Sequence, residues 1–251
     1  MVIFIFFKIV IINENSVTII NLSIYPYSVL SDNLFFEGYK IFEIYNLNES
    51  FLLKGFGIPF ILNKSNLKYK KSDAIIIYKD DFRKISFDNH NIYSQHKSIE
   101  NLNKIIFFFN KYNIKLPKDI YIYNLNYSQA FYLLPNNFFL KNEDIANGII
   151  VHELSHYMFG YIIKRKNEKD IWPEILCEAL RLKYLFEYDL DLYYKVIERK
   201  KIENNIYSKI LDYPLLLNNF EEFLRKVFEY NNLSDHEFNK IYNSLERGAY
   251  N

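Results

Sequence analysis

The pattern of apolar residues changes once along the chain, close to Ser98. Before this point, short apolar or alternating runs are separated by clusters of Asn, Ser, Asp and Gly, which is typical of strands joined by turns. The expected strands are residues 2–12, 17–20, 39–45 and 74–78. After Ser98 the spacing becomes mostly helical. Strands followed by helices predict an α+β fold.

The second part of the chain has recognisable helix boundaries. A helix should run from an N-cap at Asn142 to about residue 166. Another should begin near Pro173, because proline suits the first helical turn. Ser234 and Glu237 form a capping box that predicts the start of the last helix. The other expected elements are helices at 99–112, 190–204 and 218–230 and strands at 120–124 and 138–140.

We therefore expect two parts, a β-rich N-terminal region over residues 1–95 and a second domain over residues 96–251. Half of the 251 residues are hydrophobic and 24% are charged, which is a globular composition. The net charge of +1, from 31 basic and 30 acidic residues, lacks the basic excess that nucleic-acid binding requires. Nucleic acid is thus not an expected partner. The oligomeric state is not indicated by the sequence.

The cellular location depends on one cysteine and on the first twelve residues. Cys177 alone excludes an internal disulfide and favours a reducing compartment, so we expect a cytoplasmic protein. Residues 1–12 are strongly apolar, but Lys8 interrupts them and no basic residue precedes them, unlike a signal peptide. They are also shorter than the ~20 residues that span a bilayer. A buried strand is expected here and no membrane span; export by an unrecognised N-terminal signal is the alternative.

The sequence His152-Glu153-Leu-Ser-His156 lies inside an apolar, helical stretch. Residues four apart lie one turn apart on the same helix face, so both imidazoles can approach one ion. With 5 histidines and 18 glutamates in 251 residues, random placement would give roughly 0.007 such matches. The alternative is a solvated helix, but the apolar flanks indicate burial, and buried histidines need partners. The motif therefore predicts a Zn²⁺ site with His152 and His156 as ligands.

Glu153 occupies a neighbouring part of the helix surface. It cannot easily join the same ligand set, but it can reach a water molecule bound to the metal. Zinc lowers the pKa of such a water toward ~7, and a nearby carboxylate can accept its proton as it attacks a carbonyl. We expect Glu153 to act as this general base.

A catalytic zinc usually has a third protein ligand and one open position. Glu174 and Glu178 are four residues apart on the next expected helix and share a face. Seventeen residues separate His156 from Glu174, enough for a turn back to the first helix. From spacing alone either glutamate can be the ligand, and small Ala179 favours Glu178. Two solvated glutamates are the remaining alternative.

These residues resemble those of the gluzincin metallopeptidases, which include thermolysin-like and aminopeptidase-like enzymes and combine H-E-x-x-H with a glutamate on a following helix. The segment from His156 to Gly160 is similar to the H-x-x-F-G of the aminopeptidase branch. Residues 174–182, Glu-Ile-Leu-Cys-Glu-Ala-Leu-Arg-Leu, resemble the E-F-F-A-E-A-F-R-L run of anthrax lethal factor-like peptidases. The resemblance covers residues 143–187. It implies a zincin-like fold over residues 96–251, Glu174 as the third ligand and Glu178 as support for a ligand imidazole.

The chain also departs from these relatives. The G-x-M-x-N signature of the aminopeptidase branch is absent, so we expect an endopeptidase and no amino-terminal exopeptidase activity. Asn167 stands where lethal factor-like enzymes have a tyrosine, seven residues before the ligand glutamate. The group that stabilises the oxyanion must therefore come from elsewhere, either His236 or one of the C-terminal tyrosines. The alternative for His236 is an ordinary surface residue.

The expected function is that of a zinc-dependent metallopeptidase that hydrolyses peptides or proteins with a zinc-activated water. Residues 138–140, just before the motif, are a candidate edge strand that pairs with an extended substrate. Two alternatives stay open: a binding or scaffold protein that kept the fold without turnover, and a zinc hydrolase of a non-peptide amide.

Overall fold

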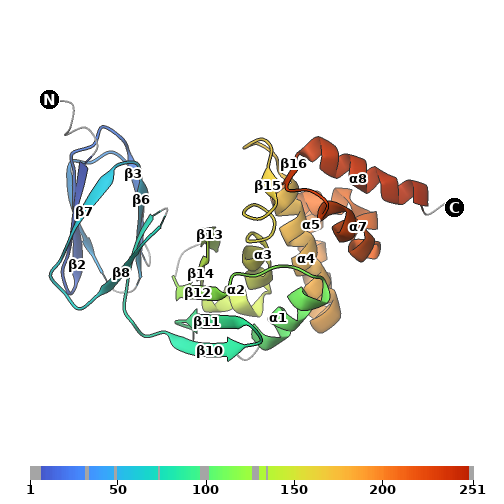
Figure 1. Cartoon of the computed structure of the whole chain (residues 1–251), viewed down its shortest axis with the longest axis horizontal. Coiled ribbons are helices and arrows are strands. Elements are labelled where there is room, and N and C mark those ends of the chain that lie inside the picture. Colours follow the sequence, from blue (N-terminus) through green and yellow to red (C-terminus); the bar gives the residue numbers. More distant parts are fainter. Residues whose placement is uncertain are drawn as a thin grey trace.

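The computed structural model describes residues 7–31, 34–47, 50–72, 74–96, 102–125, 130–133 and 135–248. It has the expected α+β organisation, with sheets in the N-terminal part and helices in the C-terminal half. Figure 1 shows the sheets on the left and the helices on the right. Within the described ranges no helix is both long enough and apolar enough to cross a bilayer. The cytoplasmic location stays a prediction.

The N-terminal part is a sandwich of two sheets. The outer sheet has the order β5-β2-β1-β7 and consists of Phe42–Asn46, Ser16–Asn21, Phe7–Ile12 and Ile58–Asn63. The inner sheet has the order β4-β3-β6-β9-β8 and consists of Leu34–Gly38, Tyr27–Ser31, Phe51–Gly55, Ala74–Tyr78 and Lys68–Lys71. Alternate side chains such as Val10, Ile12 and Phe51 form the core between the sheets. The expected strand at 2–12 is present from Phe7; residues 1–6 lie outside the described residues.

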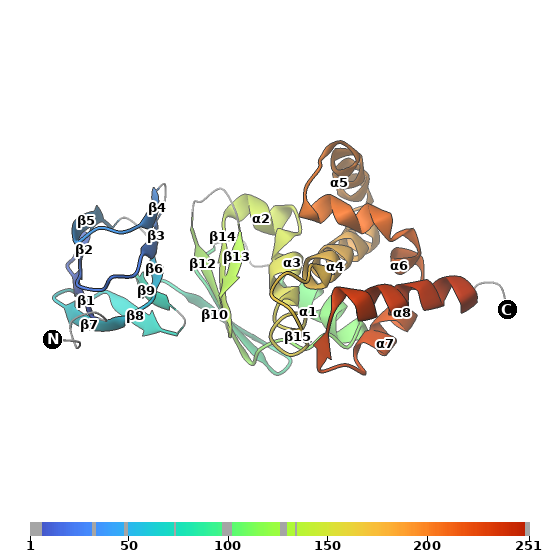
Figure 2. The same ribbon diagram turned by 90° about the horizontal axis from the view of Figure 1, so that it is seen from above.

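A third sheet, here called the central sheet, supports the helices. Its order is β10-β11-β12-β14-β13, with bounds Arg83–Phe87, His90–Ser94, Asp119–Asn124, Asn137–Leu140 and Phe131–Leu133. Strands β11, β12 and β14 are parallel, and α1 (Leu102–Lys111) connects β11 to β12. Apolar side chains of the inner sheet, including Leu52 and Ile76, pack against Tyr123 and Phe139 of the central sheet. The inner sheet is therefore covered on both faces, as Figure 2 shows.

The central sheet changes two expectations. Strands β10 and β11 precede residue 96 but belong to the same sheet as β12, since β10 pairs with β11 and β11 with β12, so a boundary that follows the sheets lies between β9 and β10. The division into domains itself stays a prediction. The expected edge strand at 138–140 is wrong: β14 pairs with β12 on one side and β13 on the other. Residues 131–133 fold back antiparallel to β14, so β13 is the edge of this sheet.

The helical half contains two small strands and the following helices. Their bounds are α2 Asn142–Ala146, α3 Ile149–Ser155, α4 Trp172–Tyr188, α5 Leu190–Ile202, the 3₁₀ helix η2 Ile206–Asp212, α6 Pro214–Asn218, α7 Phe220–Val227 and α8 Asp235–Gly248. Strands β15 (Lys164–Arg165) and β16 (Asn232–Leu233) pair in parallel. The start of α4 with Pro173 in its first turn is confirmed. The capping box is also confirmed: Ser234 N donates to Glu237 Oε2 at 2.9 Å, and Glu237 N donates to Ser234 Oγ at 3.3 Å.

The single helix expected from Asn142 to residue 166 is wrong. The chain breaks between α2 and α3 at Gly148, whose φ of 69° lies in the left-handed region that glycine adopts readily. Space is also short there, because a Cβ on Gly148 would lie 3.1 Å from Leu185 Cδ2. The helix then ends at Ser155, followed by turns and β15. The N-cap is Lys141, whose backbone N–H donates to Asp144 Oδ2 at 3.0 Å.

Candidate metal centre

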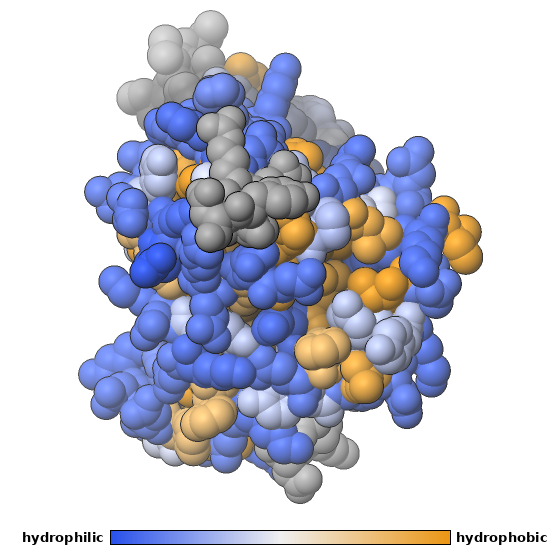
Figure 3. Space-filling view, turned by 90° about the vertical axis from the view of Figure 1, so that its right-hand side faces the viewer, coloured by the Kyte–Doolittle hydropathy of each residue, from blue (hydrophilic) through white to orange (hydrophobic). Residues whose placement is uncertain are grey.

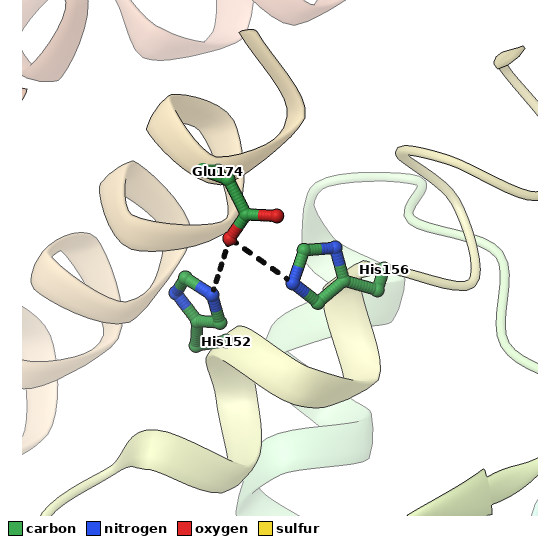
Figure 4. A group of neighbouring side chains, drawn as sticks. All are labelled: His152, His156 and Glu174. Carbon is green, nitrogen blue, oxygen red and sulfur yellow. Dashed lines mark ion pairs between the residues drawn. The ribbon is translucent and has the colours of Figure 1, made fainter. Parts of the chain in front are cut away.

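The motif residues lie where α3 packs against α4. His152 and Glu153 belong to α3 and His156 caps its C-terminal end, while Glu174 and Glu178 lie one turn apart on α4. Apolar side chains around them bury this crossing, including Ile150, Val151 and Leu154 of α3 and Leu176, Ala179 and Leu180 of α4. Figure 4 shows the Glu174 carboxylate between the two imidazoles. The structure thus brings together side chains that are up to 26 residues apart in the sequence.

The distances between these side chains suit a metal ion. Glu174 Oε2 lies 3.3 Å from His152 Nε2 and 3.5 Å from His156 Nε2. One ligand atom from each of the three residues lies within 4.8 Å of the others. A tetrahedral zinc with bonds of ~2.0–2.2 Å holds neighbouring ligand atoms roughly 3.3–3.6 Å apart. The two imidazoles and one carboxylate therefore fit Zn²⁺ in both chemistry and spacing.

The second nitrogen of each histidine also has a neighbour on α4. His152 Nδ1 lies 3.0 Å from Glu178 Oε2, and His156 Nδ1 lies 3.4 Å from Cys177 Sγ. With a metal bound, a proton on Nδ1 would leave the Nε2 lone pair free to coordinate it; without a metal, Nε2–H can instead donate to Glu174 Oε2. The sequence predicted such support for Glu178 through the resemblance. The sequence contained no indication of a role for Cys177, because its position in an apolar helix is what any small buried residue would show.

Glu178 is the most deeply buried of the carboxylates at the site. It is 1% exposed, and its Oε1 accepts from Arg181 Nη1 at 3.0 Å and from Lys200 Nζ at 2.8 Å. Burial by itself raises the pKa of a carboxyl group, but the hydrogen bond with His152 and the two cations lower the pKa of Glu178 to about 2. Glu178 is therefore ionised near neutral pH, and its contact with Nδ1 orients the His152 ring.

Glu174 has a different environment one turn nearer the start of α4. Arg165 of β15 donates from Nη2 to Glu174 Oε1 at 3.1 Å, so Oε2 is left facing the histidines. Burial would raise the pKa of Glu174, but the hydrogen bonds with His152 and His156 outweigh it and hold the pKa well below its usual range. An ionised carboxylate with one oxygen bonded to Arg165 can bind a cation through its other oxygen.

A pocket of about 430 Å³ opens beside His152 and Glu153. Burial raises the pKa of the Glu153 carboxyl, which makes this group a better proton acceptor than an exposed glutamate. Other residues that line the pocket are Ala130, Asp144, Asn147, Ile149, Glu178, Arg181, Leu192, Lys195, Val196, Arg199, Lys200, Glu203, Asn205 and Tyr207. The helix α5 and the 3₁₀ helix η2 thus form the wall opposite α3.

Tyr207 is the aromatic residue of this wall nearest the histidines. Its ring centroid lies 5.4 Å from that of His152, and its backbone carbonyl accepts from Lys200 Nζ at 3.0 Å. Burial and the negative charges of Glu174, Glu153 and Glu178 raise the pKa of Tyr207 to about 12, so its phenol stays a proton donor. The sequence marked this residue only as one of many C-terminal tyrosines, because nothing in its local pattern distinguishes it.

The structure does not bring His236 to the cluster. His236 is exposed on α8 and lines a separate surface pocket with Asn239 and Lys240. Asn167 lies in the turn before α4, where its backbone N–H donates to Asp170 Oδ2 at 2.8 Å. Of the two sources considered for the oxyanion stabiliser, the geometry favours a C-terminal tyrosine. The role of each site residue stays a prediction.

Comparisons with known proteins support the fold. No family model and no curated protein matches the sequence. An M1 zinc metallopeptidase from Deinococcus radiodurans matches the structure with a TM-score of 0.56 and 8% identity, over 96% of this chain and 90% of that chain. A variant of a two-domain M1 zinc metallopeptidase bound to L-tryptophan gives the same values. At this identity the likeness shows the fold alone: the chain has a fold similar to that of these M1 zinc metallopeptidases. The narrower likeness to thermolysin or lethal factor stays a prediction.

Proposed function

We propose that the chain is a zinc-dependent metallopeptidase with His152, His156 and Glu174 as metal ligands. The observation that carries the proposal is the convergence of two imidazole Nε2 atoms and one carboxylate oxygen at distances of 3.3 and 3.5 Å. In an apolar helix crossing, three such groups need a cation or protons to offset their desolvation. The fold shared with M1 zinc metallopeptidases supports the same conclusion.

Each residue of the site has a separate role in the proposed hydrolysis of the peptide bond. When bound, zinc supplies a Lewis acid that lowers the pKa of a water molecule and polarises the substrate carbonyl. Glu153 accepts the proton of the attacking water and passes it to the leaving amine, a role that its raised pKa favours. The Tyr207 hydroxyl donates a hydrogen bond to the carbonyl oxygen as negative charge develops there. Glu178 keeps His152 oriented throughout.

The substrate we propose is a peptide or protein cleaved within its chain. The edge strand β13 lies beside the motif, since the ring of Tyr132 is parallel to that of His156 with centroids 6.3 Å apart. An extended peptide can add to such an edge through backbone hydrogen bonds.

The first prediction concerns the metal. Purified protein should contain about one zinc per chain by elemental analysis, because the site offers one set of three ligands. His156→Ala should lose the zinc and the peptidase activity. The matched control is His236→Ala, which removes an exposed histidine and should change neither. Wild-type protein that binds no zinc in zinc-replete buffer would contradict the proposal. Loss of activity in His236→Ala would indicate that His236 takes part in catalysis.

The second prediction concerns the general base. Glu153→Gln should keep one zinc per chain but lower kcat by ~10²–10⁴, because an amide cannot accept the proton of the attacking water. Activity is measured on a fluorogenic peptide blocked at both termini, so that neither an aminopeptidase nor a carboxypeptidase can cleave it. Glu143→Gln, an exposed change on α2, is the control. The same peptide is also offered with a free amino terminus. If wild-type protein cleaves this form and not the blocked one, the endopeptidase proposal is wrong.

The third prediction separates the two glutamates of α4. Glu174→Gln should weaken zinc binding far more than the ~10–100-fold typical of residues that support a ligand, because it removes a ligand charge. Glu178→Gln should stay within that range, since an amide oxygen can still accept from His152 Nδ1. Competition with a chelator measures both affinities. The reverse order would identify Glu178 as the ligand.

The fourth prediction tests the phenol of Tyr207. Tyr207→Phe keeps the ring that contacts His152 but removes the hydrogen-bond donor. We expect kcat to fall ~100-fold or more, with KM and zinc content nearly unchanged, because the donor acts on charge that develops in the transition state. Tyr194→Phe, on the exposed side of α5, is the control. An unchanged kcat in Tyr207→Phe would mean that another group stabilises the oxyanion.

A further inference from the structure

The outer sheet of the sandwich has one face turned away from the rest of the molecule. Figures 1 and 2 show this sheet at the end of the molecule opposite the helices. The strand register places on one face every second residue of β1, β2, β5 and β7. This outward face consists of Phe7, Ile9, Ile11, Ser16, Thr18, Ile20, Phe42, Ile44, Asn46, Ile58, Phe60 and Leu62. Among these described positions none carries a charge.

The apolar part of this face is large and accessible. Phe42, Ile44, Ile58, Phe60 and Leu62 are each between 52% and 57% exposed. Side chains of this size expose roughly 100 Å² each at that fraction, and the partly buried residues of β1 and β2 enlarge the patch to about 600–800 Å². The largest apolar patch of a typical monomer is ~300–600 Å². Two such patches pressed together would bury ~1,200–1,600 Å², the size of a stable protein interface.

Two other strands of this chain carry charged side chains at solvent-exposed positions. Strand β8 (Lys68–Lys71) and the start of β10, Arg83 and Lys84, place cations on exposed positions. Strand β9 is apolar along its whole length, and it is covered on both faces, by the sandwich core and by the central sheet. The opposite end of the molecule has a mainly hydrophilic surface, as Figure 3 shows. The outer sheet therefore has the composition of a sheet covered on both sides.

We propose that a second copy of this chain covers the outward face, in a two-fold symmetric dimer with the two outer sheets packed face to face. A sheet face of aliphatic and aromatic side chains is complementary to itself at the ~10 Å spacing of packed sheets. Because no described outward side chain is charged, self-association brings no like charges together. Homodimer interfaces are more apolar than other protein surfaces. A lipid surface would be bound with flanking Lys or Arg on the same face, which these positions lack.

The dimer is tested first by mass. Sedimentation equilibrium between 1 and 100 µM should give twice the 30.4 kDa of one chain at the upper concentrations. Phe60→Glu combined with Ile44→Glu should raise the dimer dissociation constant at least ~100-fold, because it buries unpaired charges at the interface. Phe107→Glu is the matched control: Phe107 is 63% exposed on α1 and lies outside this face. Circular dichroism and thermal melting show whether each variant is folded.

Cross-linking tests the symmetry. Ile9 lies on an interior strand of the outer sheet, near the middle of the face, so Ile9→Cys should lie close to its own copy in the dimer. Cys177 is buried, so the new thiol is the accessible one. With diamide as oxidant, Ile9→Cys should form a disulfide-linked dimer and Phe107→Cys should not. Wild-type protein that is monomeric at 100 µM, or equal cross-linking of both variants, overturns the proposal. The proposal is also overturned if the protein is a monomer that binds phosphatidylcholine vesicles through this face.

Discussion

The arrangement of the site depends on the burial of one carboxylate, that of Glu178. Moving an ion from water into a protein interior costs several kcal/mol, and contacts of good geometry must offset that cost. Glu178 makes these contacts with His152 of α3, Arg181 of α4 and Lys200 of α5. Because the partners come from three helices, the relative position of those helices and the orientation of the His152 ring are fixed together.

The two glutamates of α4 have different partners because they lie at different depths. Glu178 lies a turn deeper, where two cations and an imidazole Nδ1 occupy both of its oxygens. Glu174 lies near the start of the helix, where Arg165 occupies one oxygen and the other faces the two Nε2 atoms. Both oxygens of the deeper carboxylate have cationic or imidazole partners, whereas the shallower carboxylate has one oxygen that faces only the two histidines.

The sandwich and the helical half are joined through apolar contacts between the inner and the central sheet. This contact supports β14 and β13, the strands next to the metal centre, from behind. It also leaves the outer sheet at the far end of the molecule, as Figures 1 and 2 show. The proposed dimer through the outer sheet would therefore leave the two candidate metal sites far apart, with neither pocket covered by the interface.

The sequence by itself determined what local interactions decide. These are the order of sheet and helix, the start of α4 at Pro173, and the placing of His152 and His156 one turn apart. Periodicity says which side of a segment is apolar, but it does not say what covers that side. Tertiary structure alone decided that β13 and not β14 forms the sheet edge, that β10 and β11 join β12, and that Cys177 and Tyr207 reach the histidines. Each of these depends on contacts between segments distant in sequence, which pattern and propensity do not encode.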